Sequence, residues 1–172
     1  LALLAALMIT AFRCGGPQSI ADRAPTVPGG AVSGALALGA VTVLLGALTA
    51  NLDAGPACQG FPLCNGLVWP LGENSGLARI HWIHRLLAFG LAGHLIGLWI
   101  GARRRGRSST PLTLAAILTV GQLVVAAAMV LTFLQPEWRA IHVAVGTGIW
   151  AALVWLRWGD QASGTPASRV KQ

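Results

Sequence analysis

The sequence predicts an all-α membrane protein: a four-helix transmembrane bundle preceded by the tail of another transmembrane helix. The first observation is the composition, since 55% of the 172 residues are hydrophobic and only 10% are charged, whereas a soluble domain carries about a quarter charged residues. The second is a set of four apolar stretches close to the roughly 20 residues that a membrane span needs. These stretches are residues 31–50, 80–102, 111–134 and 140–158.

The segments between the spans are short and polar. Residues 1–12 are apolar but too few for a span, so we expect the tail of a helix whose beginning is missing, with a short interfacial helix as the alternative. Residues 13–30 are rich in Gly and Pro and are predicted to form a linker. A polar loop at 51–79 holds two cysteines, and a polar tail covers 159–172.

Small residues in two of the spans predict close helix packing. In the first span they recur at helical spacing, at Ala35, Gly39, Thr42 and Gly46. In the second span three glycines repeat every four residues, at Gly93, Gly97 and Gly101. Because small residues let helix backbones approach each other in a membrane, both stripes predict a neighbouring helix.

The basic residues predict the side of the membrane on which each loop lies. The net charge is +7, but the basic side chains form no face with stacking aromatics, so we expect no nucleic-acid partner. Nine of the twelve Lys and Arg lie in the linker, the loop at 103–107, the tail and at Arg157. This side is therefore predicted to be cytoplasmic, with the cysteine loop outside a cell (inner) membrane and lipid as a partner. Three tryptophans would lie near the outer interface: Trp69, Trp82 and Trp138.

Two histidines are candidates for metal binding. His84 lies at the start of the second span and His142 at the start of the fourth, and both helices enter from the outer side. Two imidazoles at matched depth on different helices are what axial ligation of a haem iron requires. Gly146, one turn below His142, would leave room for a flat macrocycle. The alternative is that each histidine joins a polar network or reaches the interface, but the matched pair favours haem b as the cofactor.

Three further polar residues surround His84 or His142 at the outer side. His81, one turn before His84, could line the haem edge, hydrogen-bond a propionate or sit in interfacial water, and a catalytic role for it is left open. Arg85 and Arg139 could each pair with an anionic propionate of the cofactor. Contact with a lipid headgroup is the alternative for both arginines.

His94 is set apart from this group. It follows His84 by ten residues, which is about 15 Å deeper at helical rise. At that depth it cannot ligate the same iron opposite His142. We expect it to hydrogen-bond a neighbouring helix, through Gln122 or Thr132.

Cys58 and Cys64 are separated by five residues in the outer loop. Two cysteines this close in an exported loop most often form a disulfide. Their spacing is not the C-x-x-C of a thioredoxin-type redox centre, and no further Cys or His pair stands at zinc-ligand spacing. Whether such a disulfide is structural or redox-active is left open, and Cys14 has no predicted partner.

Two segments resemble a known family. GALTANLDAGPACQGFPLCNG followed by IHWIHR, and the later IHVAVGTGIW, are similar to the haem A synthase family of bacteria and mitochondria. The resemblance covers residues 31–158. It implies two similar four-helix halves, each with a histidine pair for a haem and a cysteine-bearing outer loop. It also implies an oxidoreductase that converts a methyl group of haem O to the formyl group of haem A, for cytochrome oxidase assembly.

The resemblance assigns roles to individual residues. It implies that His84 and His142 are axial ligands and that Cys58 and Cys64 form the loop disulfide. Family members carry a carboxylate three residues before the first histidine of the catalytic half, where this chain has His81. The chain therefore resembles the C-terminal half, which binds a cofactor haem for electron transfer. The implied partners are the missing N-terminal half or a second copy, haem O synthase and an unidentified electron donor.

Two functions of other classes are also compatible with the sequence. A quinone-linked membrane disulfide oxidoreductase is also a four-helix bundle with outer cysteines, but the absence of C-x-x-C speaks against it. A non-enzymatic b-type cytochrome anchor would use the same histidine pair to pass electrons between partners. The motif FPLCNG at 61–66 favours the synthase.

Overall fold

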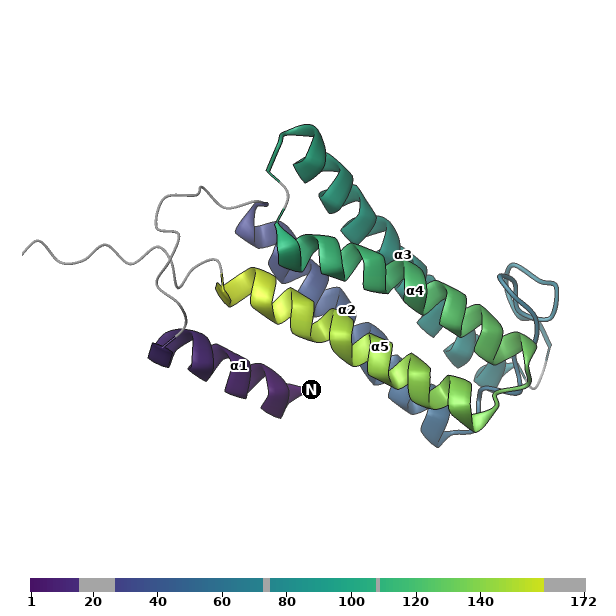
Figure 1. Cartoon of the computed structure of the whole chain (residues 1–172). Helices are drawn as coiled ribbons and strands as arrows, with labels where there is room; N and C mark the ends of the chain where they lie inside the picture. The colour runs from purple at the N-terminus through teal and green to yellow at the C-terminus, as the bar shows by residue number, and fades with distance from the viewer. Residues whose placement is uncertain (16–26, 73–74, 108, 160–172) are drawn as a thin grey trace, which may run out of the picture.

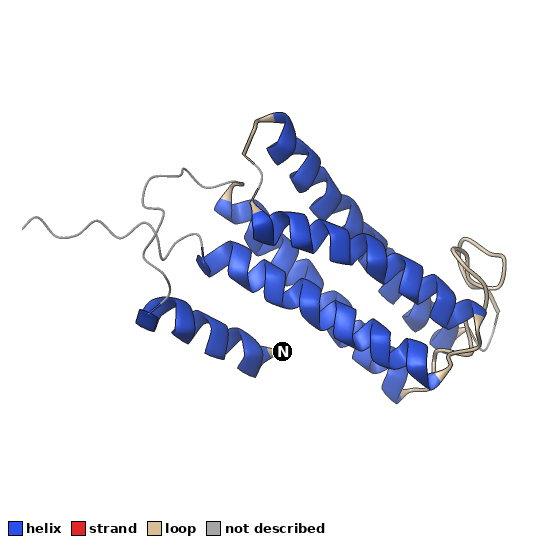
Figure 2. Ribbon diagram, viewed as in Figure 1, coloured by secondary structure: helices blue, strands red, loops and turns tan. Residues whose placement is uncertain are grey.

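The described part of the chain consists of helices and the loops between them. A computed structural model describes residues 1–15, 27–72, 75–107 and 109–159, and in these residues it contains no β-strand. The predicted all-α class is confirmed (Figure 2). In chain order the elements are α1 (Ala2–Gly15), α2 (Gly29–Asn51), α3 (Gly76–Arg104), α4 (Thr110–Leu131), α5 (Pro136–Val154) and the π-helical turn η1 (Trp155–Gly159) (Figure 1).

Four helical segments are long and apolar enough to cross a membrane: α2, α3, α4, and α5 continued by η1. A helix satisfies its backbone hydrogen bonds internally, which is what a lipid environment requires of a spanning segment. The protein is therefore a multi-pass membrane protein, as the composition predicts. The cysteine loop and the arginine-rich loop at 103–107 lie at opposite ends of the bundle (Figure 1).

The four long helices form a closed arrangement in which each helix has two neighbours. α2 packs against α3 and α5, and α4 packs against the same two helices. α3 and α5 do not pack directly on each other in the described part of the chain, so they occupy diagonally opposite positions. The shorter α1 lies beside α5 and η1 (Figure 1).

The centre of the bundle is an apolar core to which all four long helices contribute. The small residues of α2 bring it close to its neighbours, since Ala35 is fully buried and a Cβ at Gly39 would contact Leu91 and Leu153 at 3.8 Å. The small-residue stripe predicted for the first span therefore does face the bundle. The buried members of this core are Ala35, Leu91, Leu95, Ala115, Ile149, Ala152 and Leu153.

The glycine stripe of the second span does not pack on another helix within the described chain. Gly93 and Gly97 are exposed, and a Cβ at either position would meet no atom within 4 Å. Gly101 faces the side chain of Arg105 on its own helix. The prediction of a packing face was wrong for this part of the chain, because α3 turns its leucines toward the core instead.

The loop at 51–79 is shorter than predicted, because α3 begins at Gly76. The backbone amide of Arg79 donates to the Ser75 carbonyl at 2.8 Å, and its Nε donates to the Pro70 carbonyl at 3.2 Å. The first turn of α3 thus includes Arg79, whose side chain reaches back to the loop. The apolar stretch used to predict the span begins only after this turn.

The turn between α4 and α5 also differs from the prediction. α4 ends at Leu131, and the chain reverses through Phe133 and Leu134, whose φ angles are 57° and 63°. α5 begins at Pro136, four residues earlier than predicted. Proline suits the first helical position because its missing N–H would have no partner there, and Glu137 in the first turn complements the helix dipole.

The predicted linker at 13–30 is helical at both ends, because α1 continues to Gly15 and α2 starts at Gly29. Glycine at the start of a helix adopts the required conformation without steric cost. The central part of the linker and the tail after residue 159 lie outside the described residues.

Candidate functional site

The candidate site lies at the end of the bundle that carries the cysteine loop. His84 is in the third turn of α3 and His142 is in the second turn of α5. Since α3 and α5 are diagonal to each other, the two histidines lie on opposite helices of the bundle.

His84 is held against α2 by a single well-placed hydrogen bond. Its Nδ1 lies 2.9 Å from the carbonyl oxygen of Thr42. A carbonyl can only accept, so Nδ1 carries the hydrogen and the lone pair is on Nε2. Gly46 leaves room for the imidazole of His84 beside α2, because a Cβ at residue 46 would lie 2.9 Å from Cε1 of His84.

His142 is in contact with Gln122 of α4. The Gln122 Nε2 lies 3.2 Å from Nδ1 and 3.3 Å from Nε2 of His142, and it donates to the His142 carbonyl at 3.0 Å. The amide oxygen of Gln122 is buried and has no partner in the described residues. A Cβ at Gly146 would lie 3.3 Å from the Gln122 nitrogen, so this glycine makes room for the amide.

Sequence reasoning assigned Gln122 to the wrong histidine. His94 instead bonds α2, since its Nε2 lies 3.0 Å from the Ala31 carbonyl, and Thr132 donates to Ala128 of its own helix. The reason is that His94 lies on the face of α3 that packs against α2, and not on the face that packs against α4. A usable signal was that Gln122 is the only amide side chain in α4, at a depth closer to His142 than to His94.

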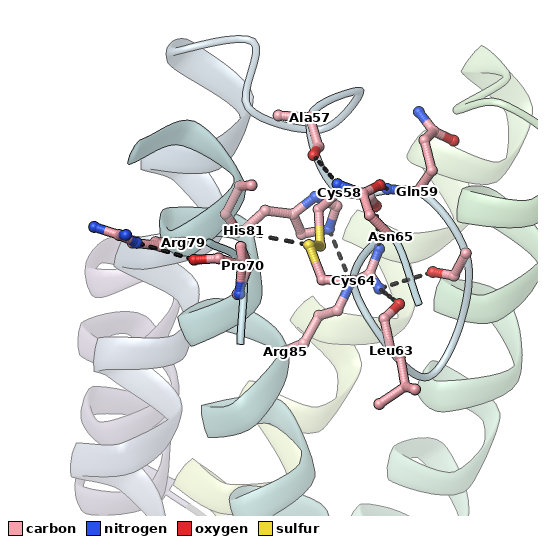
Figure 3. The surroundings of a disulfide bond; sticks show 12 residues. Ala57, Cys58, Gln59, Leu63, Cys64, Asn65, Pro70, Arg79, His81 and Arg85 are labelled. Carbon is pink, nitrogen blue, oxygen red and sulfur yellow. Dashed lines mark hydrogen bonds between the residues drawn. A yellow bond between two sulfur atoms is a disulfide. The ribbon is translucent and has the colours of Figure 1, made fainter. Parts of the chain in front are cut away.

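Arg85 is buried and fastens the cysteine loop to α3 (Figure 3). Its NH1 donates to the carbonyls of Gly60 and Leu63 at 2.8 and 3.0 Å, and its NH2 donates to the Cys58 carbonyl at 2.7 Å. Its Nε donates to Nε2 of His81 at 3.2 Å. Four of the five N–H groups of the guanidinium are thus used within the protein.

His81 has both ring nitrogens engaged. Its Nδ1 lies 3.1 Å from the Gly55 carbonyl and therefore donates to it, while Nε2 accepts from Arg85. The side chain is 4% exposed. The prediction that His81 could sit in interfacial water was wrong, because the cysteine loop covers it.

The positive charge of Arg85 has no negative charge among its hydrogen-bond partners. They are three backbone carbonyls and a neutral imidazole. A buried ion without an opposite charge is costly, so this position favours an additional anionic group nearby. Arg139, the second arginine predicted here, is exposed in the first turn of α5.

Cys58 and Cys64 are joined by a disulfide with their Cα atoms 4.8 Å apart. Both are fully buried and pack against Ala78 and Trp82 of α3. Trp82, predicted at the membrane interface, is 4% exposed and packs in the same buried cluster as the two cysteines. The loop is therefore folded onto α3 by apolar packing as well as by Arg85. The remaining cysteine, Cys14, is exposed and free.

Among the described residues, His84 and His142 are the candidate metal ligands of the site. In the described ranges, no three His, Cys, Asp or Glu side chains are grouped to hold a metal ion. A bare ion would therefore lack ligands between His84 and His142. A metal that brings its own donor atoms would need only these two imidazoles from the protein, and the chemistry of the two side chains is compatible with such a group.

The chain resembles known proteins over most of its length. Residues 1–154 match the profile of the family described as "Cytochrome oxidase assembly protein". The chain is 28% identical over 139 residues to a heme A synthase of Ruegeria sp. TM1040, covering 73% of this chain and 36% of that protein. It is 31% identical over 144 residues to a heme A synthase of Rhizorhabdus wittichii, covering 78% and 41% respectively.

A relative with a different name is also similar. The chain is 35% identical over 130 residues to a protoheme IX farnesyltransferase of Halobacterium salinarum, covering 72% of this chain and 28% of that protein. The chain thus spans less than half the length of each of these three relatives. No solved structure matches it.

Proposed function

Since this chain belongs to the cytochrome oxidase assembly protein family, we propose that it is part of a haem A synthase. This oxidoreductase converts a methyl group of haem O to the formyl group of haem A. The chain would be the C-terminal half and would bind haem b through His84 and His142 as an electron-transfer cofactor. The catalytic residues would then lie in an N-terminal half or a second copy.

One observation carries the proposal: α3 and α5, which lie diagonally opposite, each carry a half-buried histidine at the cysteine-loop end of the bundle. His84 is already in the tautomer that leaves Nε2 free to ligate iron, because Nδ1 donates to Thr42. Orienting a ligating imidazole through its other ring nitrogen is the usual role of such a partner. A haem iron held by both imidazoles would have no position left for oxygen, and the chemistry it would supply there is electron transfer.

The arginines support an orientation of the cofactor in which its propionates point toward the loop end of the bundle. Arg85 is a buried cation that needs an anion, and it retains one N–H beyond the four that are used. A haem propionate at the loop end of the bundle would supply that charge. Arg139 is a second candidate for a propionate, with a lipid headgroup as its alternative.

His81 supports the assignment to the non-catalytic half. Proton transfer by a histidine requires a ring nitrogen that can reach the substrate, and both nitrogens of His81 are engaged by Gly55 and Arg85. We propose that the cysteine loop lies outside the membrane and the arginine-rich loop in the cytoplasm. The Cys58–Cys64 disulfide would persist there as a structural link.

The proposal is tested by two measurements on the purified chain. Titration with haem b should give a low-spin spectrum at one haem per chain. Mixing with a separately expressed N-terminal half should restore conversion of added haem O to haem A. In cells, haem O synthase would supply this substrate. Haem A formed by this chain alone would contradict the division of labour. Low-spin haem without any restored conversion would favour the cytochrome anchor.

Gly46→Ala should weaken haem binding roughly tenfold, the lower end of the effect of losing an orienting partner. The added Cβ would lie 2.9 Å from Cε1 of His84, so the imidazole must leave the Thr42 carbonyl. Equilibrium haem titration measures the effect. Gly34→Ala on the same helix is the control, because a Cβ there meets no atom within 4 Å, and equal affinities for both variants would contradict the assigned role of Gly46.

A further inference from the structure

We propose that Gln122 of α4 is the positioning residue for His142. Its amide would donate to the imidazole in the haem-free protein and accept from the imidazole once a ring nitrogen serves as a ligand. This inference rests on the proposed haem site. It is carried by the contact between an amide and an imidazole on two neighbouring helices, and by the unpaired oxygen of that amide.

The contact between Gln122 and His142 leaves the imidazole without a fixed tautomer. The amide nitrogen is almost equally far from both ring nitrogens, at 3.2 and 3.3 Å. The lone-pair directions of the two nitrogens diverge, and only one of them accepts in a neutral ring. Gln122 therefore favours neither nitrogen, whereas the Thr42 carbonyl selects one tautomer of His84.

The second observation is that the side-chain oxygen of Gln122 is unpaired. It is buried without a donor in the described residues, and an unpaired buried polar group costs about 1–3 kcal/mol. When one nitrogen of His142 acts as a ligand, the other carries a hydrogen that needs an acceptor. A half-turn of the amide would exchange its oxygen and nitrogen and place the oxygen close to the ring, in exchange for the 3.0 Å hydrogen bond that Nε2 donates to the His142 carbonyl.

Gly146 gives this amide its space. It lies one turn after His142 on α5, and a Cβ there would lie 3.3 Å from the Gln122 nitrogen. The sequence suggested that this glycine makes room for a macrocycle. The structure instead places the Gln122 amide beside it, so Gly146→Ala should disturb the same contact from the opposite helix.

The test compares full-length variants loaded with haem b. Gln122→Leu should lower haem affinity roughly tenfold, raise the midpoint potential and shift the g-values of the low-spin electron paramagnetic resonance signal. The potential rises because an imidazole whose N–H lacks an acceptor donates less to ferric iron. Gln122→Glu, which keeps an acceptor, should restore the affinity and lower the potential. Gly146→Ala should shift the potential in the same direction as Gln122→Leu.

Thr119→Val is the matched control. Thr119 is buried on the same helix, and its hydroxyl donates to Ala115 of its own helix, so the potential and the signal should not change. Unchanged g-values and potential in Gln122→Leu, with low-spin haem still bound, would overturn the role of Gln122 and leave the haem site intact. Failure of the unmodified chain to bind low-spin haem would overturn the proposed function itself.

Discussion

His84→Ala and His142→Ala are each expected to abolish the low-spin haem spectrum. Either change removes one of two axial ligands, which leaves iron five-coordinate and high-spin. The loss of affinity should exceed the roughly 10–100-fold cost of losing an orienting partner, because the ligand itself is gone. Optical titration of the purified variants with haem b measures both the affinity and the spin state.

His94→Ala is the matched control for this experiment. His94 lies on α3 with His84, but it bonds the Ala31 carbonyl of α2 and not the site. Its replacement should leave the low-spin spectrum unchanged. If His84→Ala and His142→Ala both retain that spectrum, these histidines are not the axial ligands.

Arg85→Leu is expected to lower the free energy of unfolding by about 3 kcal/mol, the combined effect of leaving several buried acceptors unpaired at about 1–3 kcal/mol each. The guanidinium serves the carbonyls of Cys58, Gly60 and Leu63 and the imidazole of His81. A leucine can serve none of them. Unfolding in mixed micelles with increasing SDS measures the change, and limited proteolysis reports on release of the cysteine loop.

Two variants make this result specific to the guanidinium. Arg79→Leu, on the same helix, removes one side-chain hydrogen bond to the Pro70 carbonyl and should cost less than about 1 kcal/mol. Arg85→Lys retains the charge but lacks the planar fork of donors, so its stability should be intermediate. Equal stabilities of Arg85→Leu and Arg79→Leu would show that Arg85 does not hold the loop.

The fold was predictable because each span is a long apolar stretch. The ends of the helices were less predictable, since the first turns of α3 and α5 hold polar residues such as Arg79 and Glu137 that extend beyond the apolar stretch. The direction of each helix face also depends on the neighbours present. For that reason the prediction that small residues face a neighbouring helix failed for Gly93 and Gly97 but succeeded for Ala35 and Gly39.

The haem A synthase family was predictable from the cysteine loop and the histidines, and the family match confirms it. The depth of His84 and His142 followed from helical rise alone. Their partners did not, because Thr42 contributes a backbone carbonyl, which any residue carries. The burial of Arg85 and His81 depends on how a loop folds over the helix, and spacing along the sequence contains no such information.

The diagonal placement of α3 and α5 puts the proposed iron ligands on one pair of helices. The other pair, α2 and α4, determines how far apart these ligands lie. The two histidine-bearing helices do not pack on each other in the described chain, and α2 and α4 lie between them. The width of the site is therefore set by the thickness of two helices that contribute no ligand. On α2, Gly46 is the small residue at the level of the site, because a Cβ there would lie 2.9 Å from Cε1 of His84, while Gly39 and Ala35 keep α2 close to the apolar core below it.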